Sequence, residues 1–435
     1  VALDLKRLDL ADLPYLPLLT RMLSNLGTRD LDEVAFSRTI GAHTGGLSVS
    51  YFTSPKPQGA AVGGPDDMIA YLVLRGKSVA NKAASLFDLA GEMLRSVDLD
   101  NRERVIEMLK ESKVRIQSSV VSAGNSYASA QLASRYSLHA HVSELMGGLS
   151  QYGTIKAALQ EAETEWPSLL NRLERMRSAL VTSDCAVINL SADERSMSTA
   201  TALVPSLLKT LGKPSGPDSS TRATTWALPT SAALILPAHE GLQVATQVNY
   251  VAKGCPLYEP GEVVGGSSSV ITRYLRTAYL WDKVRVQGGA YGCSLGFSRF
   301  TGFATYSSYR DPNVATTLDT YDATPEFLRQ NPLGPAELAK AVIGAIGELD
   351  APQSVDSKGY TSMLRYLLGV KEEARQAWRE EVLSTSAADF IAFADRLEAV
   401  AQRGSVAVVG SEKALLAANK ALPTARSMDL RQALD

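Results

Sequence analysis

The chain has 435 residues, of which 45% are hydrophobic and 21% are charged, and its formal net charge is −2 at pH 7. This balance of charge gives no electrostatic reason to expect binding to nucleic acid or to an anionic membrane surface. The longest apolar runs are far shorter than the roughly 18–20 residues that a membrane-spanning helix needs. The three cysteines are widely spaced and form no CxxC pair, which argues against a disulfide framework and a thiolate zinc site.

The first part of the sequence predicts a mixture of helices and strands. In chain order we expect a helix over 13–26, strands over 44–54 and 69–75, helices over 79–96, 101–121, 125–146 and 156–180, a strand over 185–192 and a last helix. The opening residues, VALDL, have the pattern of the middle of a strand. Because a truncated sheet exposes an edge, we expect a preceding segment to complete this sheet.

The second part of the sequence repeats this order after a stretch rich in Pro, Gly, Ser and Thr. That stretch, residues 212–230, predicts an exposed linker. The elements that follow are a strand over 242–252, a helix over 267–282, a Gly-Gly turn with a strand pair over 288–309, helices over 313–329, 335–348, 359–368, 371–382 and 387–401, a strand over 405–411 and a last helix. The repeat predicts two homologous α+β domains, residues 1–211 and 231–435, each too large to be a solenoid unit.

The four histidines do not form a zinc-peptidase motif, because neither HExxH nor HxxEH occurs. The nearest pattern is HAHVSE, with His139, His141 and Glu144. On a helix, side chains two residues apart point about 200° apart and cannot share a metal. We therefore expect solvated or capping histidines, and no metal ligands in this chain.

Arg285 and Tyr291 flank two consecutive glycines, Gly288 and Gly289, in the run VRVQGGAYGC. One interpretation is structural: an arginine at a helix end favours the helix dipole, and a tyrosine packs at a strand start. The other is functional, since a guanidinium and a phenol at a glycine turn can hold peptide carbonyls, and the phenol can donate to an oxyanion. Arg310, in the turn that ends the next strand, is a candidate for lining the same cavity.

Several long phrases resemble a known family. They are the run from 281 to 329, SELMGGLSQY (143–152), TQVNYVAKG (246–254), DSKGYTSMLRYLLGV (356–370) and EEVLSTSAADFIAFAD (380–395). In order, they resemble the C-terminal half of the presequence proteases, which belong to the pitrilysin family of zinc metallopeptidases. The resemblance covers nearly the whole chain.

The resemblance implies a fold and an activity. Family members have four homologous α+β domains, each a mostly antiparallel sheet covered by helices, in two halves that close like a clamshell around a chamber. This chain would supply the third and fourth domains. The N-terminal half carries the zinc ligands and the general base, while an Arg and a Tyr of the C-terminal half, here Arg285 and Tyr291, reach across to the substrate. The implied substrates are cleaved targeting peptides and other short unstructured peptides, in the mitochondrial matrix or the chloroplast stroma.

The chain departs from the family in lacking HxxEH, and with it every zinc ligand and the base. We therefore expect Zn²⁺ in an N-terminal half, on the same precursor or a separate chain, and no activity from this chain alone. The alternative is a non-catalytic structural or processing-partner subunit of the same superfamily, although a scaffold does not need Arg285 and Tyr291. Cys293, two residues after Tyr291, is a candidate for a thiol whose modification blocks the chamber.

Overall fold

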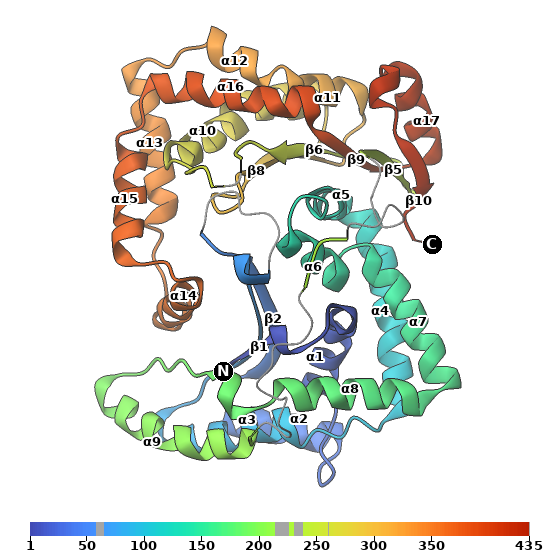
Figure 1. The fold of residues 1–435 in the computed structure, drawn as a ribbon, viewed down its shortest axis with the longest axis vertical. Helices are drawn as coiled ribbons and strands as arrows, with labels where there is room; N and C mark the ends of the chain where they lie inside the picture. The colour runs from blue at the N-terminus through green and yellow to red at the C-terminus, as the bar shows by residue number, and fades with distance from the viewer. Residues whose placement is uncertain (58–64, 214–225, 230–237, 260, 435) are drawn as a thin grey trace.

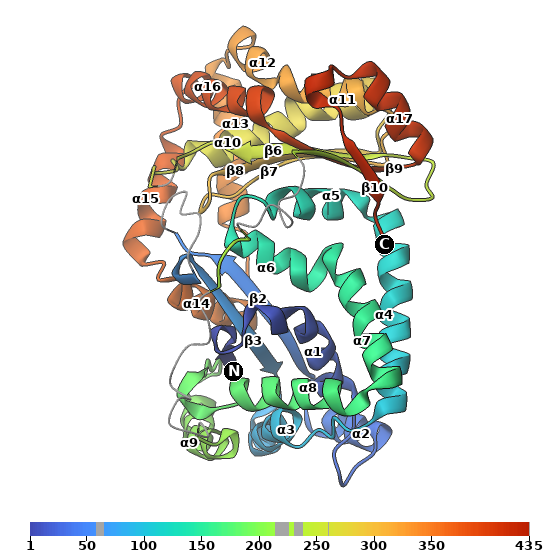
Figure 2. The same cartoon turned by 45° about the vertical axis from the view of Figure 1, so that its right-hand side comes forward.

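The computed structural model describes residues 1–57, 65–213, 226–229, 238–259 and 261–434. Two open sheets lie in different parts of the molecule, with helices around both (Figures 1 and 2). The strands are β1 (Ala2–Asp4), β2 (Leu47–Pro55), β3 (Met68–Gly76) and β4 (Ala186–Val187) in the first sheet, and β5 (His239–Gln243), β6 (Tyr250–Pro256), β7 (Gly292–Phe297), β8 (Phe303–Tyr309), β9 (Ser405–Gly410) and β10 (Asp429–Gln432) in the second.

Helices make up most of the remaining chain. Before the second sheet they are α1 (Leu16–Asn25), α2 (Glu33–His43), α3 (Ala83–Arg95), α4 (Arg102–Ser122), α5 (Gly124–Ala133), α6 (Leu138–Gly147), α7 (Ser150–Thr164), α8 (Trp166–Leu180) and α9 (Glu194–Leu211). Within and after it they are α10 (Ser267–Leu275), the π-helix η7 (Arg276–Gln287), α11 (Ala315–Asp322), α12 (Thr324–Gln330), α13 (Pro335–Leu349), α14 (Val355–Leu368), α15 (Glu372–Leu383), α16 (Ala387–Arg403) and α17 (Glu412–Ala421). Short 3₁₀ turns are η1 (Leu5–Arg7), η2 (Leu10–Tyr15), η3 (Pro65–Asp67), η4 (Ala80–Lys82), η5 (Ser183–Cys185) and η8 (Thr424–Arg426).

Four strands of each sheet follow the same order. The first sheet has the order β4-β1-β3-β2, and the second contains β9-β6-β8-β7 in the equivalent succession. Every neighbouring pair within these two sets is antiparallel. The second sheet is extended by β5 and β10, which pair in parallel. The mixed α+β class expected from the sequence is confirmed.

Two predicted strands differ from those observed. The strand expected over 242–252 is two strands, because β5 pairs with one side of β9 and β6 with the other, so residues 244–249 must cross over β9. The strand expected over 185–192 pairs only at Ala186–Val187, and a 3₁₀ turn, η5, includes Cys185. Strand β1 lies inside the first sheet, between β3 and β4.

Three predicted helices are each divided into two. The one expected over 313–329 forms α11 and α12, which Ala323 separates. The helix expected over 125–146 ends at Ala133, and α6 begins after Ser137, whose hydroxyl accepts a hydrogen bond from the Ala140 amide and so caps the new helix. The helix expected over 156–180 is interrupted at Glu165, where Pro167 occupies the first turn of α8. Helix α2 and strand β10 were not expected from the sequence.

Part of the predicted linker is buried rather than exposed. Trp226 is 2% exposed, and its indole N–H donates to the backbone oxygen of Leu8 at 2.9 Å. The indole packs with the core beneath the first sheet. Most of the remaining predicted linker lies outside the described residues.

Each sheet is covered on one face by a helix from the other part of the chain. Helix α5 packs against β6, β8 and β9 of the second sheet, where Ala128 and Leu132 meet Tyr250 (Figure 1). Helix α14 packs against the first sheet, where Met363 meets Val73. This exchange joins the two parts of the chain into one body with interlocked cores.

Candidate functional site

The predicted glycine turn follows directly from the π-helix η7. The amide of Gly288 donates to Lys283 O at 3.0 Å, the i→i−5 bond of a π-helix, and the amide of Gly289 donates to Arg285 O at 3.0 Å. A Cβ at Gly288 would lie 2.6 Å from Val284 O, and Gly289 has φ +80°. Both positions therefore require glycine, one for space and the other for backbone conformation.

Tyr291 lies directly before β7, the strand that leaves this turn. Its amide donates to Tyr309 O at 3.1 Å and to Arg310 O at 3.3 Å. Its ring meets the Tyr309 ring edge to face, with centroids 5.8 Å apart. The side chain is 66% exposed, and its hydroxyl makes no hydrogen bond within the described part of the chain. The backbone and the Tyr309 ring thus hold the phenol in place, while its hydroxyl remains available to a ligand.

Arg285 lies in the last turn of η7, at the helix end that the sequence predicted. Its guanidinium carbon lies 3.9 Å from the centroid of the Trp281 ring and 5.7 Å from that of Tyr291. None of the described carboxylates forms an ion pair with it. The two residues singled out from the sequence are therefore neighbours, with a free guanidinium beside a free phenol.

The predicted residue Arg310 lies in a second turn, adjacent to the first. Among the described residues it is the one non-glycine position with positive φ, at 49°. The Asn313 side chain of this turn donates to Gly288 O at 2.7 Å, and Pro312 approaches the Cβ position of Gly289 at 3.5 Å. The structure therefore brings Gly288, Gly289 and Arg310 together with Arg285 and Tyr291.

The second turn is held in place by Asp311, which is fully buried. Its backbone exchanges two hydrogen bonds of 2.8 Å with Asn249, and its carboxylate accepts from Thr317 Oγ1 at 2.8 Å and from the Asn313 amide at 2.9 Å. Burial raises the pKa of Asp311, and the hydrogen bonds from Asn313 and Thr317 oppose that rise. Sequence analysis did not find the supporting role of Asp311 and Asn313, although both stand in the RDPN turn directly after Arg310.

Cys293 does not have the environment of a reactive thiol. It is half-buried, and burial together with the nearby Asp311 raises the pKa of its thiol to about 11, against the opposing effect of Arg285. The thiol is therefore protonated at neutral pH, and the protonated form is a poor nucleophile. The structure gives no support to its proposed sensitivity to modification.

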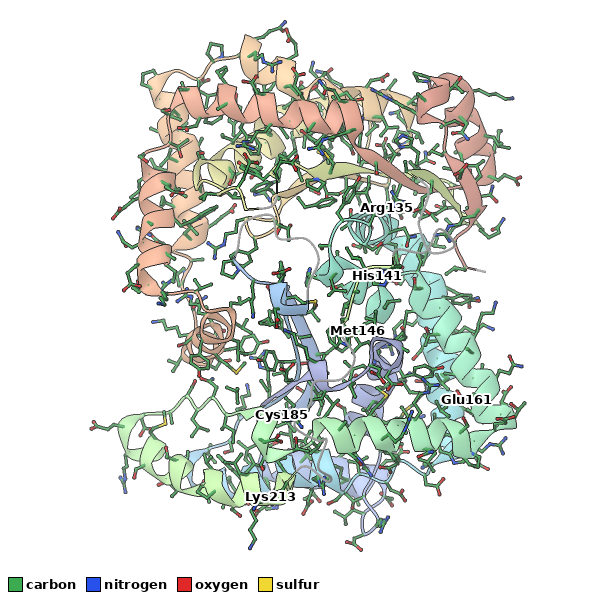
Figure 3. All side chains as sticks on the ribbon, in the orientation of Figure 1. Arg135, His141, Met146, Glu161, Cys185 and Lys213 are labelled. Atoms are coloured by element: carbon green, nitrogen blue, oxygen red, sulfur yellow. The ribbon has the colours of Figure 1, made fainter. Side chains whose placement is uncertain are left out.

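The described residues contain no group of three or more His, Cys, Asp or Glu side chains that could hold a metal ion. His139 and His141 lie on α6 and are half-buried, where solvated or capping histidines were expected, and burial lowers the pKa of both. Figure 3 labels His141. Glu144 is turned away from a shared site, because its Oε1 accepts from the amide and hydroxyl of Ser150 at 3.0 Å each. The donor set therefore does not fit zinc.

Over the described residues, no helix combines the length and apolar character needed to cross a membrane.

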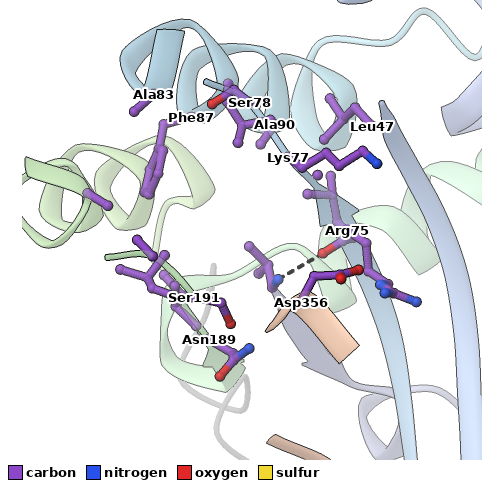
Figure 4. Close-up of a pocket in the computed structure, with 18 of the residues that line it drawn as sticks. Leu47, Arg75, Lys77, Ser78, Ala83, Phe87, Ala90, Asn189, Ser191 and Asp356 are labelled. Atoms are coloured by element: carbon purple, nitrogen blue, oxygen red, sulfur yellow. Dashed lines mark hydrogen bonds between the residues drawn. The ribbon is translucent and has the colours of Figure 1, made fainter. Parts of the chain in front are cut away.

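A cavity of about 680 Å³ lies elsewhere, between the first sheet, α3, the start of α9 and α14 (Figure 4). Lys77, Asn189, Ser191 and Asp356 contribute polar groups to its wall, and Phe87 contributes an apolar surface. Neither Arg285 nor Tyr291 lines it. The predicted site is thus an exposed surface beside a sheet edge, distinct from this cavity.

Comparisons with known proteins place the chain in a family. Residues 239–412 match the family model described as the PreP C-terminal domain, and residues 1–157 match a model described as associated with peptidases of family M16, subfamily C. Presequence protease 1, chloroplastic/mitochondrial, of Arabidopsis thaliana is 35% identical over 96% of this chain and 37% of its own length. A mitochondrial presequence protease of Yarrowia lipolytica is 26% identical over 86% of this chain and 36% of its own length. The chain thus spans less than half the length of these relatives.

Solved structures show the same fold. The peptidase M16 inactive domain from Pseudomonas fluorescens superposes with a TM-score of 0.58 at 16% identity, covering 91% of this chain and 87% of that one. The first half of the periplasmic protease PqqL from Escherichia coli has a TM-score of 0.56 at 13% identity and covers 94% of this chain and 85% of its own. Together with the sequence matches, these findings show that the chain belongs to the pitrilysin (M16) peptidase family and corresponds to the C-terminal part of the presequence proteases.

Proposed function

We propose that this chain is the substrate-positioning, chamber-closing half of a zinc metallopeptidase that degrades cleaved targeting peptides and other short unstructured peptides. The observation that carries the proposal is a pair of donors at one hydrogen-bonded turn that no other described group uses. Arg285 has no carboxylate partner and Tyr291 no hydroxyl partner within the described part of the chain, and Tyr291 is 66% exposed. Neither donor is used by another group of the described fold, so both are available to a bound ligand.

The two side chains have separate tasks in this proposal. The guanidinium of Arg285 presents its N–H groups to carbonyl oxygens of an extended peptide and so orients the backbone. The Tyr291 hydroxyl donates to the oxygen that becomes negative as a tetrahedral intermediate forms. Gly288, Gly289 and Arg310 form the wall along which the peptide backbone approaches. Closing the chamber would exclude water and strengthen these contacts.

The metal belongs to the other half of the assembly in this proposal, since the described residues offer no ligand set for it. Zinc bound there would acidify a water molecule, and a carboxylate of that half would accept its proton. The zinc-bearing half is the proposed partner, on the same precursor or as a separate chain. Size selection follows from chamber volume, because a closed chamber admits only short, flexible peptides.

We propose the same domain limits that the sequence repeat suggested, namely residues 1–211 and 231–435 joined by 212–230. The shared strand order β4-β1-β3-β2 and β9-β6-β8-β7 supports this division. The exchange of α5 and α14 between the two sheets would make the pair move as one half of the clamshell. Relatives with chloroplastic and mitochondrial names support a location in the chloroplast stroma or mitochondrial matrix.

A second candidate is a non-catalytic structural or processing-partner subunit. The fold shared with a domain described as inactive favours it. The free donors of Arg285 and Tyr291 argue against it, because a scaffold has no use for them.

The deciding experiment is native purification of the protein with whatever remains bound to it. Zinc would be measured by elemental analysis, and hydrolysis of an unstructured presequence-like peptide would be followed with and without a chelator. We expect about one zinc per assembly and activity that the chelator removes. An assembly without zinc and without peptide hydrolysis would overturn the proposal and leave the structural subunit.

A further inference from the structure

Trp281 is a large aromatic side chain in an unusual position. It lies in η7 and remains 49% exposed, and it is absent from the hydrophobic clusters of the described core. Leaving half of an indole in water gains little for the stability of the fold. It contacts Arg285, whose guanidinium carbon lies 3.9 Å from the ring centroid.

The π-helical geometry of η7 is suited to this contact. Hydrogen bonds from residue i to i−5 widen each turn, so side chains four and five positions apart lie close to the same line. The Lys283–Gln287 and Gln287–Asp282 contacts, at 3.3 Å and 2.7 Å, have these two spacings. Trp281 and Arg285 are also four positions apart, and the guanidinium stacks on the indole ring. π-Helical turns are frequent at functional sites.

The kind of contact matters for what Arg285 can still do. A carboxylate partner would fix the guanidinium but would occupy the N–H groups on one of its edges. An aromatic face holds the guanidinium through its charge and flat surface, and leaves the N–H groups in the plane free to donate. Trp281 at 3.9 Å and Tyr291 at 5.7 Å from the guanidinium carbon together provide such support.

We propose that Trp281 is a positioning residue of the peptide site. Its ring holds the Arg285 guanidinium beside Tyr291 with its N–H donors free for the carbonyl oxygens of a bound peptide. This inference rests on the proposed function, because it assigns Trp281 a role only through Arg285.

The test uses the assembled, zinc-containing protein with Trp281→Ala, Trp281→Phe, Arg285→Ala and the double variant Trp281→Ala/Arg285→Ala. We expect Trp281→Ala to lower kcat/KM for an unstructured peptide by roughly 10- to 100-fold, since small misplacements of orienting groups have effects of this size. Trp281→Phe should restore most of the activity, because it keeps an aromatic face. In the Arg285→Ala background, removing the indole should have no further effect.

Trp378 provides a control outside the site. The guanidinium carbon of Arg299 lies 5.1 Å from the centroid of the Trp378 ring. Trp378→Leu therefore removes a similar cation–π contact without changing Arg285 or Tyr291. We expect Trp378→Leu to retain kcat/KM within about twofold. Equal losses from Trp378→Leu and Trp281→Ala, or additive losses in the double variant, would overturn the role of Trp281.

An activity-independent measurement separates this inference from the proposed function. The emission of Trp281, obtained as the difference between the parent protein and Trp281→Phe, should become more accessible to acrylamide in Arg285→Ala. No change would overturn the stacking itself. If Arg285→Ala leaves peptide hydrolysis intact, the proposed function of the Arg–Tyr pair fails even where the quenching result holds. If Arg285→Ala lowers hydrolysis and Trp281→Ala does not, only the role of Trp281 fails.

Discussion

Arg135 and Glu240 form a buried ion pair between the two parts of the chain. Arg135 follows α5 and lies next to the second sheet, and Glu240 lies on β5 with no exposed surface (Figure 3). Arg431 of β10 contacts the other carboxylate oxygen of Glu240 at 3.1 Å. One buried carboxylate thus sits between two guanidinium groups brought together by three separate segments.

Replacing Glu240 with Ala should destabilise the protein strongly. The change leaves two arginines without their partner, one of them largely buried, and breaking a buried pair in this way costs about 3–5 kcal/mol. The free energy of unfolding from urea titration would measure it. Glu348, 61% exposed and paired with Arg273, is the control, because Glu348→Ala should cost less than about 1 kcal/mol. Similar losses in the two variants would contradict this prediction.

Glu144 should make stability depend on pH. Burial raises the pKa of this carboxyl to about 7, and the hydrogen bonds from Ser150 only partly oppose that rise. Its Oε2 has no hydrogen-bond partner among the described residues, so no donor at that oxygen stabilises the ionised form. Because the folded-state pKa lies above the unfolded one, the folded state binds the extra proton, and stability falls as pH rises from about 4.5 to about 7.

The variant Glu144→Gln should remove this fall, which we expect to be of order 3 kcal/mol. His139 and His141 act in the opposite direction, because burial lowers the pKa of both, so their contribution to stability rises with pH. The measurement is therefore the difference in unfolding free energy between parent and variant at several pH values from about 4.5 to about 8. A difference that does not change with pH would refute the prediction.

Gly124 should be intolerant of a side chain, because it lies where α5 meets the second sheet. A Cβ there would fall 2.3 Å from the Tyr250 ring, whose position is fixed by a 2.7 Å hydrogen bond from its hydroxyl to Val121 O. We expect Gly124→Ala to destabilise the protein by roughly 1–3 kcal/mol through overpacking. Gly153, on α7 with nothing within 4 Å of its Cβ position, is the matched control. Gly153→Ala should instead stabilise by about 0.5–1 kcal/mol.

Tyr291→Phe in the assembled peptidase should lower kcat by about 10²-fold with a smaller change in KM. The hydroxyl makes no contact that supports the fold within the described residues, whereas a single donor to an oxyanion typically has an effect of this size. Steady-state kinetics on an unstructured peptide, with thermal unfolding as the stability control, would measure it. Equal effects on kcat and 1/KM would instead indicate uniform binding of substrate and transition state.

The sequence predicted elements well where the pattern is local. The apolar spacing of α1, the alternation in β2 and the helix that leads to Arg285 all appear near their expected positions. It failed where contacts with distant segments of the chain determine the structure. No local signal in residues 242–252 says that β5 and β6 lie on opposite sides of β9, and none in α5 and α14 says that each covers the sheet of the other part. These contacts join residues far apart in the chain.

By itself the sequence determined the α+β class, the repeated order of elements, the glycine turn and the two side chains that flank it. These features depend on residue spacing and on the backbone freedom of Gly288 and Gly289. Both can be recognised in the sequence. Only the tertiary structure decided how the turn is supported. Asp311 and Asn313 secure the neighbouring turn, Tyr309 packs against Tyr291, and Trp281 holds Arg285. The physical reason is that burial and aromatic stacking depend on which strands and turns become neighbours. Long-range packing alone determines these neighbours.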